Sequence, residues 1–252
     1  MKRLLFSLAI VMMTLGAAAS TVSKAFTIKG KINAIKTYGG VEVNYTPSSA
    51  VSVKAFADSK YMNRVSVKLK GGVLEVGFDS SNLVGSTPKV KVELSCPAFG
   101  EYVMSGGSDI DVKGGLSVNT LKITTSGGAD LTFEKPVTAK TVNVNSSGGS
   151  DVEFDSTLKC TTLNVKSSGG ADFEAEVSAA VVNVIASGGS DVTLSGKSDR
   201  VNFIASGAGS IKASRLIATQ GSAKASGAGD IRCNVKSLDS NSSGAGEIKN
   251  RK

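Results

Sequence analysis

The sequence predicts an all-β protein, a single-stranded right-handed parallel β-helix (β-solenoid) with rungs of about 20 residues. Two observations support this fold class. A glycine-containing corner recurs eight times at nearly constant spacing, and the residues on both sides of each corner alternate between apolar and polar types. Such alternation is typical of half-buried strands. One unit is too short to bury its own apolar face, but stacked copies share a core. The right hand follows from the usual handedness of parallel crossovers.

The chain begins with a predicted signal peptide, residues 1–19. Lys2 and Arg3 precede an apolar stretch from Leu4 to Leu15, and small residues follow at 17–19. This order is typical of a secretory signal, and we expect cleavage after Ala19. No later apolar run reaches the roughly 20 residues that span a bilayer. We therefore expect an exported protein in the periplasm, on the cell surface or in the medium, with residues 20–252 forming one solenoid domain.

Residues 26–95 form a less regular, β-rich part of that domain. Apolar residues alternate with polar ones at 41–45, 65–69, 74–78 and 90–94, and glycine pairs at 39–40 and 71–72 mark turns. The stretch from Asp79 to Pro88 is expected to be a longer loop. We expect this part to start the same solenoid and to cover its N-terminal end.

Residues 96–252 contain the regular rungs. Their corners begin at Ser105, Ser126, Ser147, Ser168, Ser187, Ser206, Ser226 and Ser243, in steps of 21, 21, 21, 19, 19, 20 and 17 residues. Five corners read SGGSD or SGGAD, and the last three read SGAGS, SGAGD and SGAGE. Paired glycines allow the positive φ angles of a sharp turn. Each repeat therefore predicts a strand, a tight corner and a second strand.

The corner aspartates are a candidate cation or ligand row. They are Asp109, Asp130, Asp151, Asp172, Asp191 and Asp230. Stacked neighbours about 5 Å apart repel by roughly 1 kcal/mol even in water, so backbone N–H groups, as in Asx turns, or bound cations must compensate. A structural corner is the preferred interpretation. The repeat lacks the nine-residue period of calcium-binding RTX repeats, and the row is interrupted at Ser210.

A second column holds amides at Asn143, Asn164, Asn183 and Asn202. Stacked amides can satisfy one another, which predicts a surface ladder of hydrogen bonds. A ligand-binding strip is the alternative interpretation.

Composition argues against several other functions. The chain has no histidine, no tryptophan and no CxxC motif, so no catalytic triad, metal site or cofactor is expected. Cys96, Cys160 and Cys233 are expected to be small buried residues, because Cys160 and Cys233 would lie about 17 Å apart at about 4.8 Å per rung. The net charge of +8 is largely scattered and does not interleave with aromatic residues, so we expect no nucleic-acid partner.

With this repeat in place, the chain resembles the putative auto-transporter adhesin, head GIN domain family of exported bacterial proteins. The resemblance is carried by FTIK at 26–29, YGGVEVNY at 38–45, GVLEVGF at 72–78 and the serial SGGSD and SGGAD corners. It covers nearly all of the expected mature chain. The family implies a right-handed β-helix and an adhesive role, and it implies no catalytic residues.

These observations predict a non-catalytic, adhesin-like surface protein. Its flat faces would meet an extracellular or envelope polymer, a partner protein or a second copy of the chain. Two alternatives stay open, a carbohydrate-active β-helix enzyme and a purely structural envelope protein. Short, even rungs leave few loops on which to build a catalytic site, so binding is the preferred function.

Overall fold

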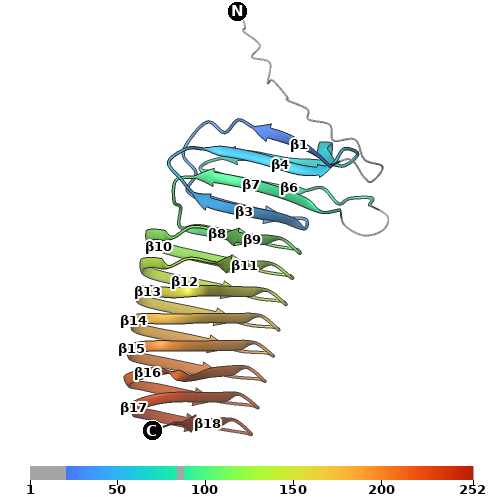
Figure 1. The fold of residues 1–252 in the computed structure, drawn as a ribbon. Helices are drawn as coiled ribbons and strands as arrows, with labels where there is room; N and C mark the ends of the chain where they lie inside the picture. Colours follow the sequence, from blue (N-terminus) through green and yellow to red (C-terminus); the bar gives the residue numbers. More distant parts are fainter. Residues whose placement is uncertain (1–20, 84–87, 252) are drawn as a thin grey trace, which may run out of the picture.

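The computed structural model describes residues 21–83 and 88–251, and it confirms the predicted β-solenoid (Figure 1). The described strands belong to one continuous sheet whose rungs stack along a single axis. The predicted signal peptide, residues 1–19, and part of the predicted 79–88 loop lie outside the described residues.

The regular rungs pair in parallel, each strand with its equivalent one turn away. Leu116 lies opposite Val137, Val137 opposite Leu158, and Leu158 opposite Val177. The strands of this part are β8 (Glu101–Met104), β9 (Asp109–Val112), β10 (Leu116–Thr125), β11 (Asp130–Phe133), β12 (Val137–Ser146), β13 (Asp151–Ser167), β14 (Asp172–Ala186), β15 (Asp191–Ala205), β16 (Ser210–Ala225), β17 (Asp230–Ser242) and β18 (Glu247–Asn250).

Unequal repeat lengths are absorbed away from the corners. The pairing offset between β13 and β14 changes from 21 residues at Phe154–Ala175 to 19 at Leu158–Val177, and similar irregularities occur between β15 and β16 and between β16 and β17. A bulge of this kind takes up extra residues while the flanking register is kept. The corner and the strand before it therefore stay aligned from rung to rung.

The N-terminal part joins the solenoid but departs from its pattern. Its elements are β1 (Thr21–Phe26), β2 (Ala34–Tyr38), β3 (Val41–Pro47), β4 (Ser52–Asp58), a 3₁₀ turn η1 (Met62–Arg64), β5 (Val65–Lys70), β6 (Val73–Phe78) and β7 (Val90–Cys96). β2 and β3 pair in parallel with β8 and β9, as a first rung would. β4 pairs antiparallel with β1 and β7, and β5 pairs antiparallel with β6.

A tight turn accounts for the antiparallel pairing of β5 with β6. Gly71 and Gly72 join these strands with φ angles of +56° and +82°, as in a two-residue hairpin loop. A hairpin forces antiparallel pairing, whereas a parallel pair needs a long crossover. Within residues 26–95, β2 and β3 thus continue the parallel stacking of the rungs, while β4 and β5 depart from it by pairing antiparallel.

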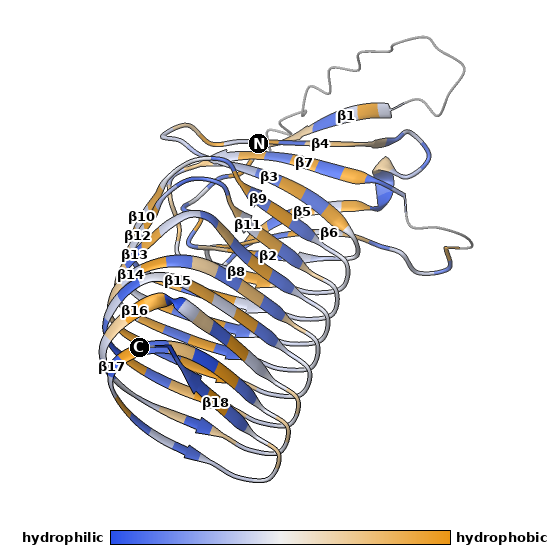
Figure 2. Cartoon of the chain, turned by 60° about the horizontal axis from the view of Figure 1, so that its bottom comes forward, coloured by the Kyte–Doolittle hydropathy of each residue, from blue (hydrophilic) through white to orange (hydrophobic). Residues whose placement is uncertain are grey.

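The interior is one continuous apolar core. Hydrophobic and hydrophilic residues alternate along the strands (Figure 2), and the hydrophobic ones make up the buried core. A stack of aromatic rings runs through the N-terminal half of this core, and neighbouring ring centroids are 4.6–5.9 Å apart. The stack consists of Tyr45, Phe99, Tyr102, Phe133, Phe154 and Phe173. The three cysteines are unpaired and buried, as the repeat spacing predicted.

The glycine corners stack through their backbones. Gly149 donates its N–H to the carbonyl of Gly127 at 2.7 Å, and Gly170 does the same to Gly148 at 2.7 Å. The first glycine of each corner has a positive φ, +77° at Gly127 and +82° at Gly148. An alanine would have to adopt this left-handed conformation and would also add a Cβ between rungs. The corner sequence is therefore a requirement of close stacking.

Two buried tyrosines give a testable contrast in the core. The Tyr102 hydroxyl is buried without a hydrogen-bond partner, whereas the Tyr45 hydroxyl lies 3.4 Å from the carbonyl of Cys96 and 3.2 Å from that of Pro97. We expect Tyr102→Phe to leave the free energy of unfolding unchanged or to raise it by about 1 kcal/mol, because it removes an unsatisfied buried group. Tyr45→Phe should lower it by about 1 kcal/mol. Urea denaturation of both variants measures the difference, and an equal loss in both would contradict this account of Tyr102.

Candidate functional site: an acidic face beside the glycine corners

Strand register brings the corner carboxylates into one column. Asp109 lies opposite Asp130, Asp130 opposite Asp151, and the pairing continues through Asp172 to Asp191. The column then passes through Ser210 to Asp230 and ends at Glu247. At its other end Glu42 of β3 lies opposite Asp109. The candidate row is thus longer than the corner motif alone indicated.

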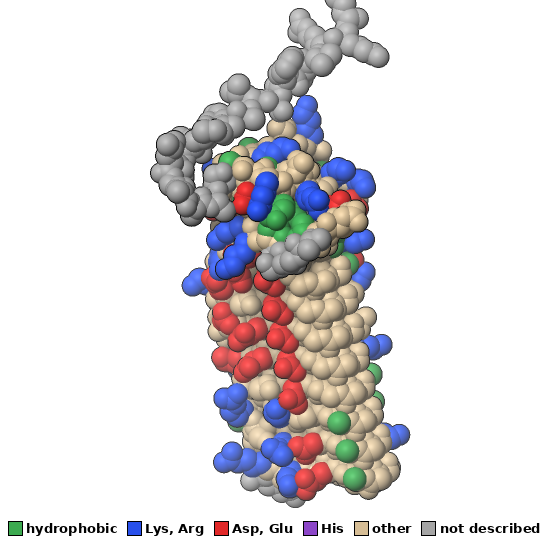
Figure 3. Space-filling view, turned by 90° about the vertical axis from the view of Figure 1, so that its right-hand side faces the viewer, with side chains coloured by type: hydrophobic (Ala, Val, Ile, Leu, Met, Phe, Trp, Pro, Cys, Tyr) green, Lys and Arg blue, Asp and Glu red, His purple; other side chains and the backbone are tan. Residues whose placement is uncertain are grey.

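A second set of carboxylates, not identified from the sequence, lies beside this column. Glu153 pairs with Glu174, two residues after the corner aspartates and on the same face of the strands. We call the combined surface the acidic face (Figure 3). Between β9 and β15 its carboxylates are Asp109, Asp111, Asp130, Glu134, Asp151, Glu153, Asp155, Asp172, Glu174, Glu176 and Asp191. The signal that would have revealed it is an acidic residue repeated two and four positions after the corner.

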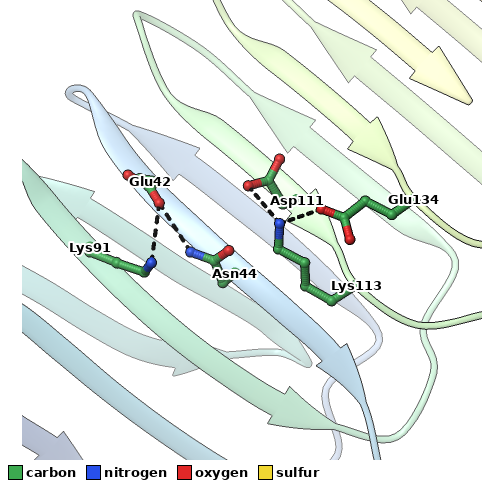
Figure 4. A network of polar contacts seen from close by, with 6 residues as sticks. All are labelled: Glu42, Asn44, Lys91, Asp111, Lys113 and Glu134. Atoms are coloured by element: carbon green, nitrogen blue, oxygen red, sulfur yellow. Dashed lines mark hydrogen bonds and ion pairs between the residues drawn. The ribbon is translucent and has the colours of Figure 1, made fainter. Parts of the chain in front are cut away.

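Lysine side chains form ion pairs with the acidic face mainly at its two ends. Near the N-terminal end, Lys113 lies between Asp111, at 3.2 Å, and Glu134, while Lys91 lies 3.5 Å from Glu42 (Figure 4). At the other end, Lys212 lies 3.0 Å from Asp191. Within the described chain the carboxylates between these ends form no ion pair; they are Asp130, Asp151, Glu153, Asp155, Asp172, Glu174 and Glu176.

The crowding of these carboxylates shifts the pKa values of several of them. Partial burial, followed by repulsion from Asp130, raises the pKa of both Asp109 and Asp151 above the ordinary value. Burial also raises the pKa of Glu153, with further repulsion from Asp155 and Glu174. At the edge of the face, hydrogen bonding to Glu134 raises the pKa of Lys113. Such a surface attracts cations and cationic molecules over a distance set by the ionic strength.

These shifts predict how stability depends on pH. A carboxyl whose pKa is higher in the folded than in the unfolded state takes up protons on folding between the two values, so the free energy of unfolding falls as pH rises through that window. Thermal denaturation should therefore give a higher midpoint just above the ordinary carboxyl pKa of about 4 than at pH 7. Asp151→Asn should raise the midpoint at pH 7 and reduce the gain on acidification.

Asp79 provides the control for this titration. Hydrogen bonds from Ser81 lower the pKa of Asp79, so its contribution to stability has the opposite sign. Asp79→Asn should not raise the midpoint at pH 7. A larger rise for Asp79→Asn than for Asp151→Asn would contradict the electrostatic account.

The corner aspartates do not form the Asx turns that the sequence led us to consider. The N–H groups of the corner bond to carbonyls of the preceding rung, as at Gly149 and Asp151. The local bond within a corner comes from the preceding serine instead: the buried Ser150 hydroxyl lies 3.1 Å from the Ser147 carbonyl and 2.9 Å from the Thr125 hydroxyl. The aspartate side chains themselves bond between rungs only through contacts such as the one in which the Asp191 N–H donates to Asp172 Oδ1, at 3.3 Å.

The carboxylate column lacks the geometry of a metal cage. Among residues 21–83 and 88–251, no group of three or more acidic or cysteine side chains converges on one point. Calcium requires six to eight oxygen ligands around one centre, whereas a flat column presents its carboxylates side by side. We predict that millimolar calcium will leave the thermal midpoint nearly unchanged. A large, saturable rise would instead identify the column as a calcium site.

The asparagine column lies on the strand that precedes each corner. Asn164 donates its side-chain N–H to Asn143 Oδ1 at 2.8 Å, Asn183 donates to Asn164 at 2.8 Å, and Asn202 donates to Asn183 at 2.7 Å. Ser222 extends the line with a 3.2 Å bond to Asn202. Each amide is thus already engaged by its neighbours, an arrangement that favours a structural ladder over a ligand-binding strip.

Comparisons with known proteins give the same architecture. Among solved structures, the chain is similar to a putative adhesin from Parabacteroides merdae, with 20% identity, TM-score 0.65 and coverage of 92% of this chain and 96% of that one. It is also similar to a putative adhesin from Bacteroides fragilis, with 20% identity, TM-score 0.68 and coverage of 93% and 98%. A third similar structure is a putative lipid binding protein from Parabacteroides distasonis, with 17% identity, TM-score 0.68 and coverage of 92% and 97%. At these identities the likeness shows the fold.

The sequence comparison is more specific. No curated protein matches the chain. In the part of the chain that the structure describes, no helix is long and apolar enough to cross a membrane. The family described as putative auto-transporter adhesin, head GIN domain, matches residues 31–157 and again 136–251. These two matches together span nearly all of the solenoid, and the chain belongs to this family.

Proposed function

We propose that this chain is an exported, non-catalytic, adhesin-like protein that binds a polymer or protein partner through its flat faces. The observation that carries the proposal is the in-register stacking of outward side chains into continuous columns, such as the corner aspartates, which gives long, regular surfaces. Membership of an adhesin family supports the same role. Export rests on the predicted signal peptide.

The acidic face is the first surface on which we expect partner contact. Its central carboxylates lack ion-pair partners in the described chain, so their charge is available to a cationic surface. Such contacts speed association and weaken as salt is added. Binding of this kind makes or breaks no covalent bond.

A screen of the mature protein against host glycans and matrix proteins tests the proposal. We expect saturable binding and an unchanged ligand. For a partner that binds the acidic face, Asp130→Asn/Asp151→Asn/Asp172→Asn should weaken binding, while Asp239→Asn, which lies in line with the asparagine column through Ser222, should not. Release of a depolymerised saccharide would favour the enzyme alternative. An empty screen combined with a leaky envelope in a deletion strain would favour the structural alternative.

A further inference from the structure

A groove lies on the solenoid beyond the acidic face, with Ser178 of its lining two residues after Glu176 of that face. Strand pairing stacks small residues in one line midway between successive corners; they are Ala139, Cys160, Ala179, Ser198 and Ala218. Each is at most 9% exposed, so they form a closed floor. The space above this floor from Lys159 to Lys236 measures about 540 Å³. Four of the floor residues, Ala139, Cys160, Ala179 and Ala218, belong to the buried core, and outward residues beside them, such as Lys159 and Lys197, line the groove.

The edges of the groove are cationic. Lys159, Lys197 and Lys236 line it, and Asp199 is the only carboxylate among its lining residues. Within the described chain none of these lysines forms an ion pair. Lys159 and Lys197 each lie opposite Ser178 on the rung between them, so their backbones are two rungs, or about 10 Å, apart. The groove therefore offers spaced, unneutralised ammonium groups along the solenoid axis.

The rest of the lining narrows the class of ligand. Ile217 is 64% exposed at the edge of the groove and offers an apolar contact. No aromatic ring lines this stretch, so it lacks the stacking platform with which proteins hold single-stranded nucleic acid. The strands beneath are paired on both sides, so a peptide cannot bind here by strand addition. A sugar chain needs neither feature, because its hydroxyl groups and C–H faces can use polar edges and an apolar contact.

We propose that this groove, which we call the lysine groove, binds an acidic polysaccharide whose carboxylates pair with Lys159 and Lys197. The two-rung separation is comparable to a disaccharide repeat, so every second sugar would present its carboxylate to a lysine. This inference goes beyond the proposed function, because the site lies on a different face and selects ligands of the opposite charge. The acidic face repels the same polymer and confines it to the groove side.

Binding of defined probes to the mature protein tests this assignment. Oligogalacturonate, a uronate polymer, should bind saturably at low salt, and uncharged dextran should not. Lys159→Gln/Lys197→Gln should weaken oligogalacturonate binding roughly tenfold, since each exposed ion pair contributes up to about 1 kcal/mol. The matched control is Lys166→Gln/Lys224→Gln, which removes two exposed charges from the face of the asparagine column. Equal losses in the two variants would overturn the proposal by showing non-specific charge attraction.

Cys160 reports directly on occupancy of the groove. It is 8% exposed and lines the groove, whereas Cys96 and Cys233 are fully buried. Burial raises the pKa of the Cys160 thiol to about 11, so its alkylation by iodoacetamide should be slow but measurable at alkaline pH. Bound oligogalacturonate should slow it further. Unchanged alkylation with the polymer bound would contradict the assignment, as would binding of anionic phospholipid vesicles or single-stranded DNA in preference to oligogalacturonate. A negative result in either test would not bear on partner binding at the acidic face, which the screen of glycans and matrix proteins tests separately.

Discussion

Gly148→Ala should lower the free energy of unfolding by about 3 kcal/mol or more, at or above the upper end of the usual range for single substitutions. Gly148 has φ +82°, and a Cβ built there would lie 2.7 Å from the carbonyl oxygen and 2.9 Å from the nitrogen of Gly127. The left-handed conformation alone costs an alanine about 1–2 kcal/mol. Relief of the clash would require the two rungs to separate, which breaks the hydrogen bonds between their corners.

Two other glycines separate these contributions. Gly71 has φ +56° but open space around its Cβ position, so Gly71→Ala should cost only about 1 kcal/mol. The Cβ position of Gly149 has its nearest neighbour, the Gly127 oxygen, at 3.9 Å, and the φ of Gly149 is not positive. Gly149→Ala should change stability by less than about 0.5 kcal/mol. Urea denaturation measures all three, and a Gly148→Ala loss no greater than that of Gly71→Ala would contradict close corner stacking.

Phe154→Ala is expected to lower the free energy of unfolding by about 3–5 kcal/mol. Phe154 is 4% exposed and stacks on Phe133, with ring centroids 4.6 Å apart and planes inclined by 10°. On its other side it contacts Phe173 at 5.9 Å. Truncation would open a cavity in the middle of the ring stack, where rigid paired strands above and below limit collapse.

The matched control is Phe56→Ala on β4. Phe56 is only partly buried and lies under the Lys54 ammonium group at 4.9 Å, so its loss should cost about 1–2 kcal/mol. Because solenoid stability is nearly a sum of neighbouring-rung terms, Phe154→Ala should also reduce cooperativity and lower the urea m-value. Similar losses from the two substitutions would contradict the proposed importance of the ring stack.

Most of the solenoid follows from the sequence because its signals are periodic. The spacing of Ser147, Ser168 and Ser187 predicts the rung, and apolar alternation around Val142 and Val165 predicts the strands. The structure places these residues in the expected register. The same pattern recurs in every repeat, so an irregular corner, such as the one with Ser210, does not hide the period.

Strand direction in the N-terminal part was harder to predict because a period-two pattern is identical for parallel and antiparallel strands. The Gly71-Gly72 pair closes a hairpin, but the Gly39-Gly40 pair has similar positive φ angles and joins β2 to β3, which pair in parallel with other strands. Glycine pairs therefore did not indicate strand direction. The pairing of β4 with β1 and β7 depends on tertiary contacts that no local motif encodes. For the same reason, the capping arrangement had to be seen in the structure.

The candidate site was only partly predictable. The corner aspartates identified one column, but the acidic face also needs Glu153 and Glu174, whose alignment depends on the parallel register of β13 and β14. The lysine groove gave no sequence signal, because Cys160, Ala179 and Ser198 look unremarkable singly. They form a floor only in the parallel register of the rungs, in which Cys160 lies opposite Ala179 after a register shift between Phe154 and Leu158, and Ala179 lies opposite Ser198.

Both proposed surfaces depend on equivalent residues stacking rung upon rung, and a distance between spin labels tests this most directly. Labels on Asn145→Cys and Asn241→Cys would lie on one exposed column, five rungs apart through Lys166, Ile185, Ile204 and Lys224. Pulsed electron paramagnetic resonance should then give one narrow distribution centred near about 24 Å, from five steps of about 4.8 Å. A broad distribution, or a centre displaced by two rungs or more, would contradict the stacked architecture and both binding surfaces with it.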